Sequence, residues 1–403
     1  MSSAEPHDNE SDLEKMKNRL CSLFHGLRSN MGDGETKRKL ILHFDVNKTI
    51  VPVDSATGET VEAALNVFLS GMAWGKDRQG EWHSKEKLSS VPQEVDDVSF
   101  YKFVERRLLP DVTCDRSAFR YQLTSFTDKP QGSNFKPYLN TLLQGLKWNL
   151  PYEERAHKLM TVPGTKECRY HFIVPAFYNL LRHLVEEGRD FAVIFRTFGN
   201  DVNSVLTSVK SAIKHNMPFC QSLESLSDNM GDNVSFLKRD PMSTANFTIQ
   251  DDGEKRKTNE NESANANSSK QVLTEEDMYT WFTNMKGFCA IRDNVEEWYQ
   301  NSFDSRKGKP FWVDLCDDQV QHVFFDDNIR PGSPDSILNL RIRDQSTTGS
   351  SFKDVARDQE YLYELSNMVP VNFPEAILNE NYFIEKLGIC EENYSKRLDS
   401  LRS

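Results

Sequence analysis

The sequence predicts an α/β fold in which a parallel sheet is covered by helices on both faces. Short, wholly apolar runs, typical of buried strands, alternate along the chain with longer stretches that have helical periodicity. Several of the apolar runs end abruptly on an acidic or hydroxyl side chain, as expected where a ligand binds at the carboxyl ends of strands. The chain has 403 residues, of which 37% are hydrophobic, and this is enough for one large core that carries a substantial insert.

The strands and helices of this fold can be placed from local patterns. Short apolar runs predict strands over residues 39–44, 190–197, 287–293 and 321–329. Helical spacing predicts helices over residues 171–188, 200–216 and 294–303. The first of these helices ends on Gly188, a common C-terminal cap, and the second has Asn200 or Asp201 available as its N-cap.

Composition narrows the classes of partner and the compartment. The 61 acidic and 49 basic side chains give a formal net charge of −12, which repels phosphate backbones and anionic membranes. No apolar run reaches the roughly 20 residues that a membrane-spanning helix needs. The seven cysteines are scattered and form no CxxC pair, as expected of reduced thiols. We therefore expect a cytoplasmic protein that binds neither nucleic acid nor a membrane.

The chain divides into a discontinuous core and several additions. We expect the core in residues 38–60 and 170–345, and an insert, mainly helical, in residues 61–169. Residues 1–37 should be flexible apart from an amphipathic helix in "DLEKMKNRLCSLFHGL", and residues 346–403 should form helices packed on the core. A polar stretch within the core, residues 251–271, lacks large apolar side chains and should be a disordered loop.

Polar side chains should meet at one edge of the predicted sheet. Asp45, Thr197 and the pair Asp326 and Asp327 each stand at the end of an apolar run. Ligands of parallel sheets bind at the carboxyl ends of the strands, so these groups should lie close together. Carboxylates without histidine or cysteine favour a hard cation, here Mg²⁺. A lysine beside such a site would hold phosphate; Lys309 is one candidate, and Lys307 or Arg292 could serve instead.

These segments resemble the motifs of the haloacid dehalogenase (HAD) superfamily. "HFDVNKT", "FAVIFRT" with its terminal Thr197, Lys309 in "GKP", and "VFFDDN" are similar in type and order to the four motifs of that family. The resemblance implies a Rossmann-like core in which Asp45 is the nucleophile that forms an aspartyl-phosphate. It also implies that Asp45, the main-chain carbonyl of Asn47 and Asp326 surround Mg²⁺, that Asp327 supports the metal or Lys309, and that Thr197 and Lys309 bind phosphate. The insert would resemble a cap, although an elaborated helical layer is equally compatible with the pattern.

One position departs from the family pattern. The phosphatases of this family have a second Asp in the first motif, which protonates the leaving group, whereas this chain has Asn47. An amide does not titrate near neutral pH, and general acid–base catalysis is typically worth about 10²–10⁴-fold. The metal contact of this position uses the main chain and would survive. His43 and His322, which lie within apolar runs, are expected in the core rather than at the metal.

Two functions therefore fit the sequence. The first is a Mg²⁺-dependent HAD-like phosphohydrolase or phosphotransferase that acts through Asp45 on a small phosphorylated metabolite. The second is a non-catalytic binding or scaffold protein that keeps the fold. Asn47 favours the second function, whereas the retained Asp45, Thr197, Asp326 and Asp327 favour the first.

Overall fold

The computed structural model describes residues 37–55, 58–89, 92–109, 116–150, 158–165, 167–240, 243–252, 271–344 and 351–402. The amphipathic helix predicted within residues 1–37 lies outside these ranges. The loop predicted over residues 251–271 also lies outside them, except for its ends. Those ends, Asp251 and Gln271, belong to two paired antiparallel strands, so the loop connects the strands of a hairpin.

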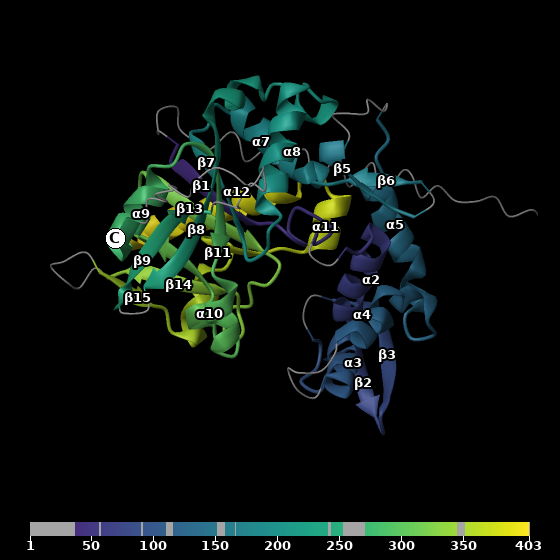
Figure 1. Ribbon diagram of the computed structural model, residues 1–403. Helices are drawn as coiled ribbons and strands as arrows, with labels where there is room; N and C mark the ends of the chain where they lie inside the picture. The colour runs from purple at the N-terminus through teal and green to yellow at the C-terminus, as the bar shows by residue number, and fades with distance from the viewer. Residues whose placement is uncertain are drawn as a thin grey trace, which may run out of the picture. The chain divides into compact units, whose positions relative to one another are not determined.

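The fold is α/β and is built on an eight-stranded sheet that is mostly parallel (Figure 1). Its strand order is β10-β9-β8-β11-β7-β1-β13-β16. The two neighbours of β1 (Lys39–Asp45) are β7 (Phe191–Thr197) and β13 (Val320–Asp326), both parallel to it. The other members are β8 (Met230–Asp240), β9 (Ser243–Asp251), β10 (Gln271–Thr274), β11 (Gly287–Asp293) and β16 (Met368–Pro370). The pairs β8·β9 and β9·β10 are antiparallel, so the sheet is mixed rather than parallel throughout.

One face of the sheet is covered by helices, as predicted. Alternate side chains of β1, among them Leu40 and Phe44, pack into the larger apolar core. The helices that pack there are α7 (Pro175–Glu186), α8 (Val202–Lys214) and α12 (Tyr382–Arg402). The helix predicted over 171–188 begins at Pro175, because proline is favoured in the first turn of a helix, and Gly188 follows it at φ +60°.

The other face differs from the prediction, because one helix there shares the face with a second sheet. Ile41 and His43 of β1 point to this side, where α9 (Glu275–Thr283) packs. Beside α9 lies a three-stranded sheet of β12 (Lys309–Val313), β14 (Leu338–Arg343) and β15 (Phe352–Asp354). Strand β12 has only five residues, all of them buried. So short a run does not reveal a strand by its periodicity alone.

The insert contains strands that the helical prediction missed. Its helices are α2 (Val61–Met72), α3 (Phe100–Leu108), α4 (Arg116–Thr124) and α5 (Lys136–Leu146). Between α2 and α3 lies an antiparallel sheet of β2 (Ala73–Arg78), β3 (Glu81–Leu88) and β4 (Val98–Ser99). The two residues between β2 and β3, Gln79 and Gly80, both have positive φ, which closes a tight hairpin turn. At the end of the insert, β5 (Thr161–Pro163) pairs with β6 (Arg169–His171).

The C-terminal segment also combines helices and strands. Besides α11 (Phe373–Leu378) and α12, it supplies β15 to the second sheet and β16 to the edge of the main sheet. Both strands have only three residues, which is too short for a period of two to be recognised. In the part of the chain that the structure describes, no helix is both long and apolar enough to cross a bilayer.

Candidate active site

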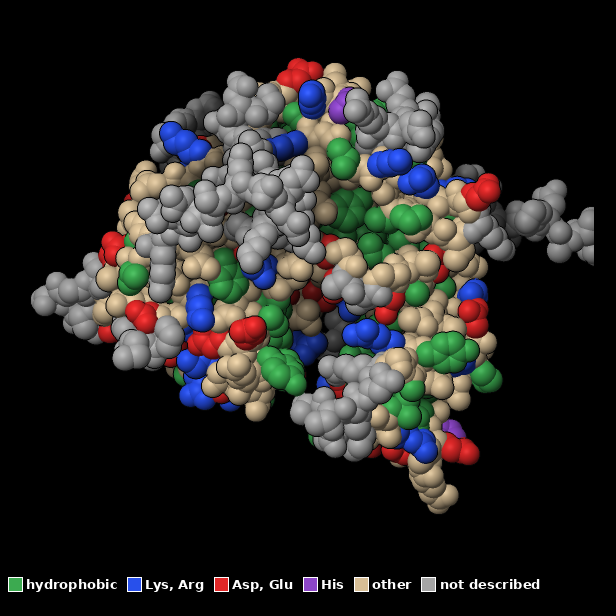
Figure 2. Space-filling model, viewed as in Figure 1, with side chains coloured by type: hydrophobic (Ala, Val, Ile, Leu, Met, Phe, Trp, Pro, Cys, Tyr) green, Lys and Arg blue, Asp and Glu red, His purple; other side chains and the backbone are tan. Residues whose placement is uncertain are grey.

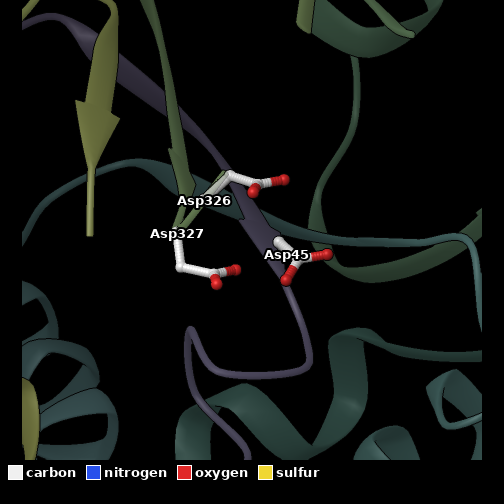
Figure 3. Close-up of side chains that lie close together, drawn as sticks. All are labelled: Asp45, Asp326 and Asp327. Atoms are coloured by element: carbon white, nitrogen blue, oxygen red, sulfur yellow. The ribbon is translucent and has the colours of Figure 1, made fainter. Parts of the chain in front are cut away.

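Three carboxylates meet where β1 and β13 end. Asp45 is the last residue of β1, Asp326 is the last residue of β13, and Asp327 follows it. Each offers a carboxylate oxygen, and these oxygens all lie within 4.8 Å of one another (Figure 3). Asp45 and Asp326 are buried and Asp327 is half-buried. Parallel pairing of the two strands brings these groups to the same edge of the sheet, as the sequence predicts.

A buried lysine from the second sheet neutralises part of this charge. Lys309 is the first residue of β12, and its Nζ donates to Asp45 Oδ1 at 2.5 Å and to Asp326 Oδ2 at 2.9 Å. A third bond, of 3.3 Å, goes to the main-chain carbonyl of Arg196. Three cations were predicted as candidates to bind phosphate, and Lys309 is the one of the three that contacts Asp45, the candidate nucleophile. Lys307 pairs with Glu297, and Arg292 forms a bidentate pair with Asp252.

The start of β12 is held in place by a close main-chain approach. The amide of Lys309 donates to the carbonyl of Ile337 at 2.7 Å. A Cβ atom on Gly308 would lie 2.1 Å from the same carbonyl oxygen, so only glycine allows this approach. Gly308 thereby sets the point from which Lys309 reaches across to the strand ends.

A buried ion pair holds the next part of β12. Arg196 of β7 forms a bidentate pair with Asp293, with bonds of 2.5 and 2.8 Å, and also donates to the carbonyl of Pro310 at 3.1 Å. Both side chains are almost fully buried. A bidentate pair of this kind fixes the relative geometry of its two side chains, although Arg196 Nη1 is buried without a hydrogen-bond partner among the described residues. Arg196 thus ties β7, β11 and β12 together next to Lys309.

The turn after β1 links the two strand ends. The carbonyl of Val46 accepts bonds from the amides of Thr49, Ile50 and Val51, which folds the turn tightly. The hydroxyl of Thr49 donates to Asp45 Oδ2 at 3.2 Å, and Thr49 Oγ1 in turn accepts from the amide of Asp327, also at 3.2 Å. Thr49 therefore orients the carboxylate of Asp45 relative to Asp327.

Asn47 and Thr197 lie close together beside this edge. Thr197 follows Arg196, the residue that pairs with Asp45 across β1 and β7. A Cβ atom on Gly199 would lie 3.5 Å from Thr197 Oγ1, 3.6 Å from Asn47 Nδ2 and 3.9 Å from Asp201 Oδ2, so the three groups surround one point. Asn47 Nδ2 donates to Asp201 Oδ2 at 3.1 Å. The other end of the amide, Asn47 Oδ1, is buried and has no hydrogen-bond partner among the described residues.

The electrostatics of the site favour an added cation. Burial, followed by repulsion from Asp326 and Asp327, raises the pKa of Asp45 well above its usual value, although Lys309 opposes this shift. Burial and then Asp326 raise the pKa of Asp327 to about 7. Burial disfavours the charged amine of Lys309, but Asp326 and Asp45 outweigh this effect and raise its pKa. One lysine thus faces three carboxylates; with all three ionised, two negative charges would be uncompensated, which matches a divalent cation.

The donor set fits Mg²⁺. Asp45, Asp326 and Asp327 offer the oxygen ligands that this ion prefers, and Asp327 is only half-buried, which suits an ion that usually keeps several waters. A second group of carboxylates, Glu94, Asp96 and Asp97, differs because two lysines, Lys76 and Lys85, together pair with all three of its members. His43 and His322 lie in the core, as predicted, and burial lowers the pKa of both, that of His322 to about 3.

Four residues of this site were not predicted as part of it. Arg196 and Asp293 interrupt apolar strands with charges, and this pattern is the signal that could have revealed them. Thr49 stands four residues after Asp45, in the same turn. Asp201 was considered only as a helix cap; its side chain makes no capping bond and binds Asn47 and the amide of Ser55 instead.

Comparison with known proteins does not add a relative. The chain matches no protein-family model, no curated protein and no solved structure.

Proposed function

We propose that the protein has a Rossmann-like core of the HAD type and is a Mg²⁺-dependent phosphohydrolase or phosphotransferase. The observation that carries this proposal is the meeting of Asp45, Asp326, Asp327 and Lys309 at one sheet edge, from three separate segments of the chain. The support is geometric and chemical: a carboxylate nucleophile, a buried cation and a metal-compatible set of oxygens lie within reach of one another.

Each residue of the site has its own role in the reaction. In the proposed reaction, a carboxylate oxygen of Asp45 attacks the phosphorus atom, the new O–P bond forms an aspartyl-phosphate, and the bond to the leaving-group oxygen breaks. Water or an acceptor hydroxyl then attacks that phosphorus and releases Asp45. Lys309 stabilises the charge of the phosphoryl oxygens, and the hydroxyl of Thr197 offers a hydrogen bond. Bound Mg²⁺ would neutralise phosphoryl charge and orient the group for in-line attack.

The leaving group must depart without help from residue 47. The amide of Asn47 donates to Asp201 and cannot give up a proton near neutral pH. The reaction should therefore suit substrates with good leaving groups, such as acyl phosphates, or proceed slowly with others. A small phosphorylated metabolite is the preferred substrate class, because the net charge of −12 disfavours polyanions.

A second candidate is a non-catalytic binding or scaffold protein that keeps the metal site. The observation in its favour is Asn47, since it removes the acid–base group while leaving the carboxylates unchanged. The two candidates differ in one property. Only the enzyme needs Asp45 to accept a phosphoryl group.

Beryllium trifluoride, which mimics an aspartyl-phosphate, tests this property without knowledge of the substrate. We expect fluorine NMR to show a bound signal for the wild type with Mg²⁺, none without Mg²⁺, and none for Asp45→Asn. The control, Asp399→Asn, makes the same change at an exposed position of α12 and should bind like the wild type. Absence of a bound signal in folded wild type would exclude the phosphoenzyme, and Mg²⁺-dependent stabilisation alone would then favour the scaffold.

A further inference from the structure

A basic cavity lies outside the carboxylate site. It has a volume of about 600 Å³ and is formed by the hairpin β8–β9, strands β14 and β15 of the second sheet, and the residues that precede β12. Five cationic side chains line it: Arg239, Arg306, Lys307, Arg341 and Lys353. Asp304 and Asp354 are its two acidic lining residues. The wall therefore carries excess positive charge, although the chain as a whole has a net charge of −12.

The deepest cation of the cavity is rigidly placed. Arg239 is nearly buried and donates to Asn339 Oδ1 at 2.9 Å and to the carbonyls of Gly308 at 3.0 Å and Lys307 at 3.3 Å. Its guanidinium also stacks 5.8 Å from the centre of the Phe247 ring. A guanidinium held in this way presents its charge with little further loss of conformational freedom on binding.

The outer cations of the cavity are exposed to solvent. The side chains of Arg306 and Lys353 are 65% and 61% exposed, and each has an acidic partner, Asp304 at 2.6 Å and Asp344 at 3.3 Å. The Lys353 contact is a single long one that contributes little, so an anion can replace Asp344 at low cost. Arg306 holds Asp304 through two bonds, of 2.6 and 3.0 Å, and keeps this partner while its exposed guanidinium faces the solvent. Figure 2 shows Lys and Arg side chains beside Asp and Glu side chains over the region that Figure 1 labels β14 and α10.

Much of the acidic charge that these cations attract lies outside the cavity wall. Arg341 pairs with Glu275 and also with Asp354 of the cavity wall, and Arg239 and Lys307 pair with Glu297. Neither Glu275 nor Glu297 is among the lining residues. Asn301 and Asn339 also line the cavity. Asn339 is held by bonds to Arg239 and Asp354, and Asn301 Nδ2 donates to the carbonyl of Glu297, so Asn301 Oδ1 is the amide group that a ligand would meet.

We propose that this cavity binds a small organic anion that carries a phosphate or sulfate group. The cations take the anionic group, and Asn301 contacts the neutral part of the molecule. Ligand pockets typically have volumes of about 300–1,000 Å³, so the cavity accommodates a molecule of metabolite size. Binding here needs neither Mg²⁺ nor Asp45, which separates the cavity from the proposed active site.

The proposal is tested by calorimetry with inorganic pyrophosphate at constant ionic strength in the presence of EDTA. Without metal, the carboxylate site repels the probe. We expect one saturable site on the wild type and on Asp45→Asn, and at least tenfold weaker binding to the double variant Arg306→Gln/Lys353→Gln. The matched control is Lys396→Gln/Arg402→Gln on α12, which removes the same two charge types from exposed ion pairs, and its affinity should stay within twofold of the wild type.

The possible results separate clearly. A saturable site that the cavity variant alone weakens supports the proposal, and melting curves show whether each variant is folded. Absence of saturable binding to folded wild type, or an equal loss in both double variants, would overturn it. Loss of binding in Asp45→Asn would place the probe at the carboxylate edge and overturn the cavity assignment as well.

Discussion

Replacement of Lys309 by Met tests whether the carboxylates depend on this lysine. The side chain is fully buried and bridges Asp45 and Asp326 at 2.5 and 2.9 Å. Methionine has a similar length and fills most of the same space, so the substitution removes the charge with little change in packing. The three carboxylates then face one another without the cation that both Asp45 and Asp326 contact.

The size of the effect follows from these contacts. At an effective dielectric constant of 20, two opposite charges at about 4 Å attract by about 4 kcal/mol, and Lys309 makes two closer contacts. Removal of the lysine also removes its desolvation cost of several kcal/mol, and protonation of Asp45, whose pKa is already raised, relieves part of the repulsion. We therefore expect Lys309→Met to lower the free energy of unfolding by about 3–5 kcal/mol, the usual range for a broken buried pair.

Urea unfolding at pH 8 in EDTA measures this loss. Lys307→Met is the control, since its partly exposed pair with Glu297 should contribute at most about 1 kcal/mol. Added Mg²⁺ should restore more stability to Lys309→Met than to the wild type, because the variant has one more uncompensated negative charge for the ion to bind. A loss similar to that of Lys307→Met, or equal Mg²⁺ effects on variant and wild type, would refute this account of the site.

Two further predictions concern the same edge. The pKa of Asp327 is raised to about 7, against about 4 in an unfolded chain, so the native state retains a proton between these values. Without metal, the free energy of unfolding should therefore fall as pH rises from about 4 to about 7. In urea unfolding over the same pH range, Asp327→Asn should show a smaller fall than the wild type. Equal falls in the two proteins would contradict this prediction. The exchange Asn47→Asp/Asp201→Asn keeps the hydrogen bond and supplies an acid at position 47. It should hydrolyse p-nitrophenyl phosphate up to about 10²-fold faster than the wild type, and equal rates in a folded protein would argue against the proposed reaction.

The sequence predicts the centre of the fold better than its periphery. The strands β1, β7, β11 and β13 could be predicted because each contains a short, mainly apolar run, which is typical of a strand buried on both faces. The hairpin β8–β9 and the short strands β15 and β16 were not, because they are irregular or span only three residues. Such strands depend on pairing with distant partners, and local periodicity does not record that pairing.

The candidate site shows the same limit in its chemistry. Asp45, Asp326 and Asp327 could be placed together because parallel strands share an edge, and this rule needs no side-chain detail. The choice of Lys309 over Lys307 could not be made in this way, because it depends on the close approach of Gly308 to Ile337 in a second sheet. The order of the strands brings the three carboxylates together, whereas the packing of the second sheet determines that Lys309 is the cation that contacts them.

The environment of Asn47 shows why a single substitution does not settle function. Read alone, the amide suggests a site that has lost its acid–base group. In the structure, however, the amide donates to buried Asp201, which also accepts from the amide of Ser55 and makes no capping bond to its own helix. A carboxylate at position 47 would lie against Asp201, and two such charges at about 3 Å destabilise each other. Asn47 and Asp201 are therefore complementary, and the amide has a structural partner that a vestigial residue would not need.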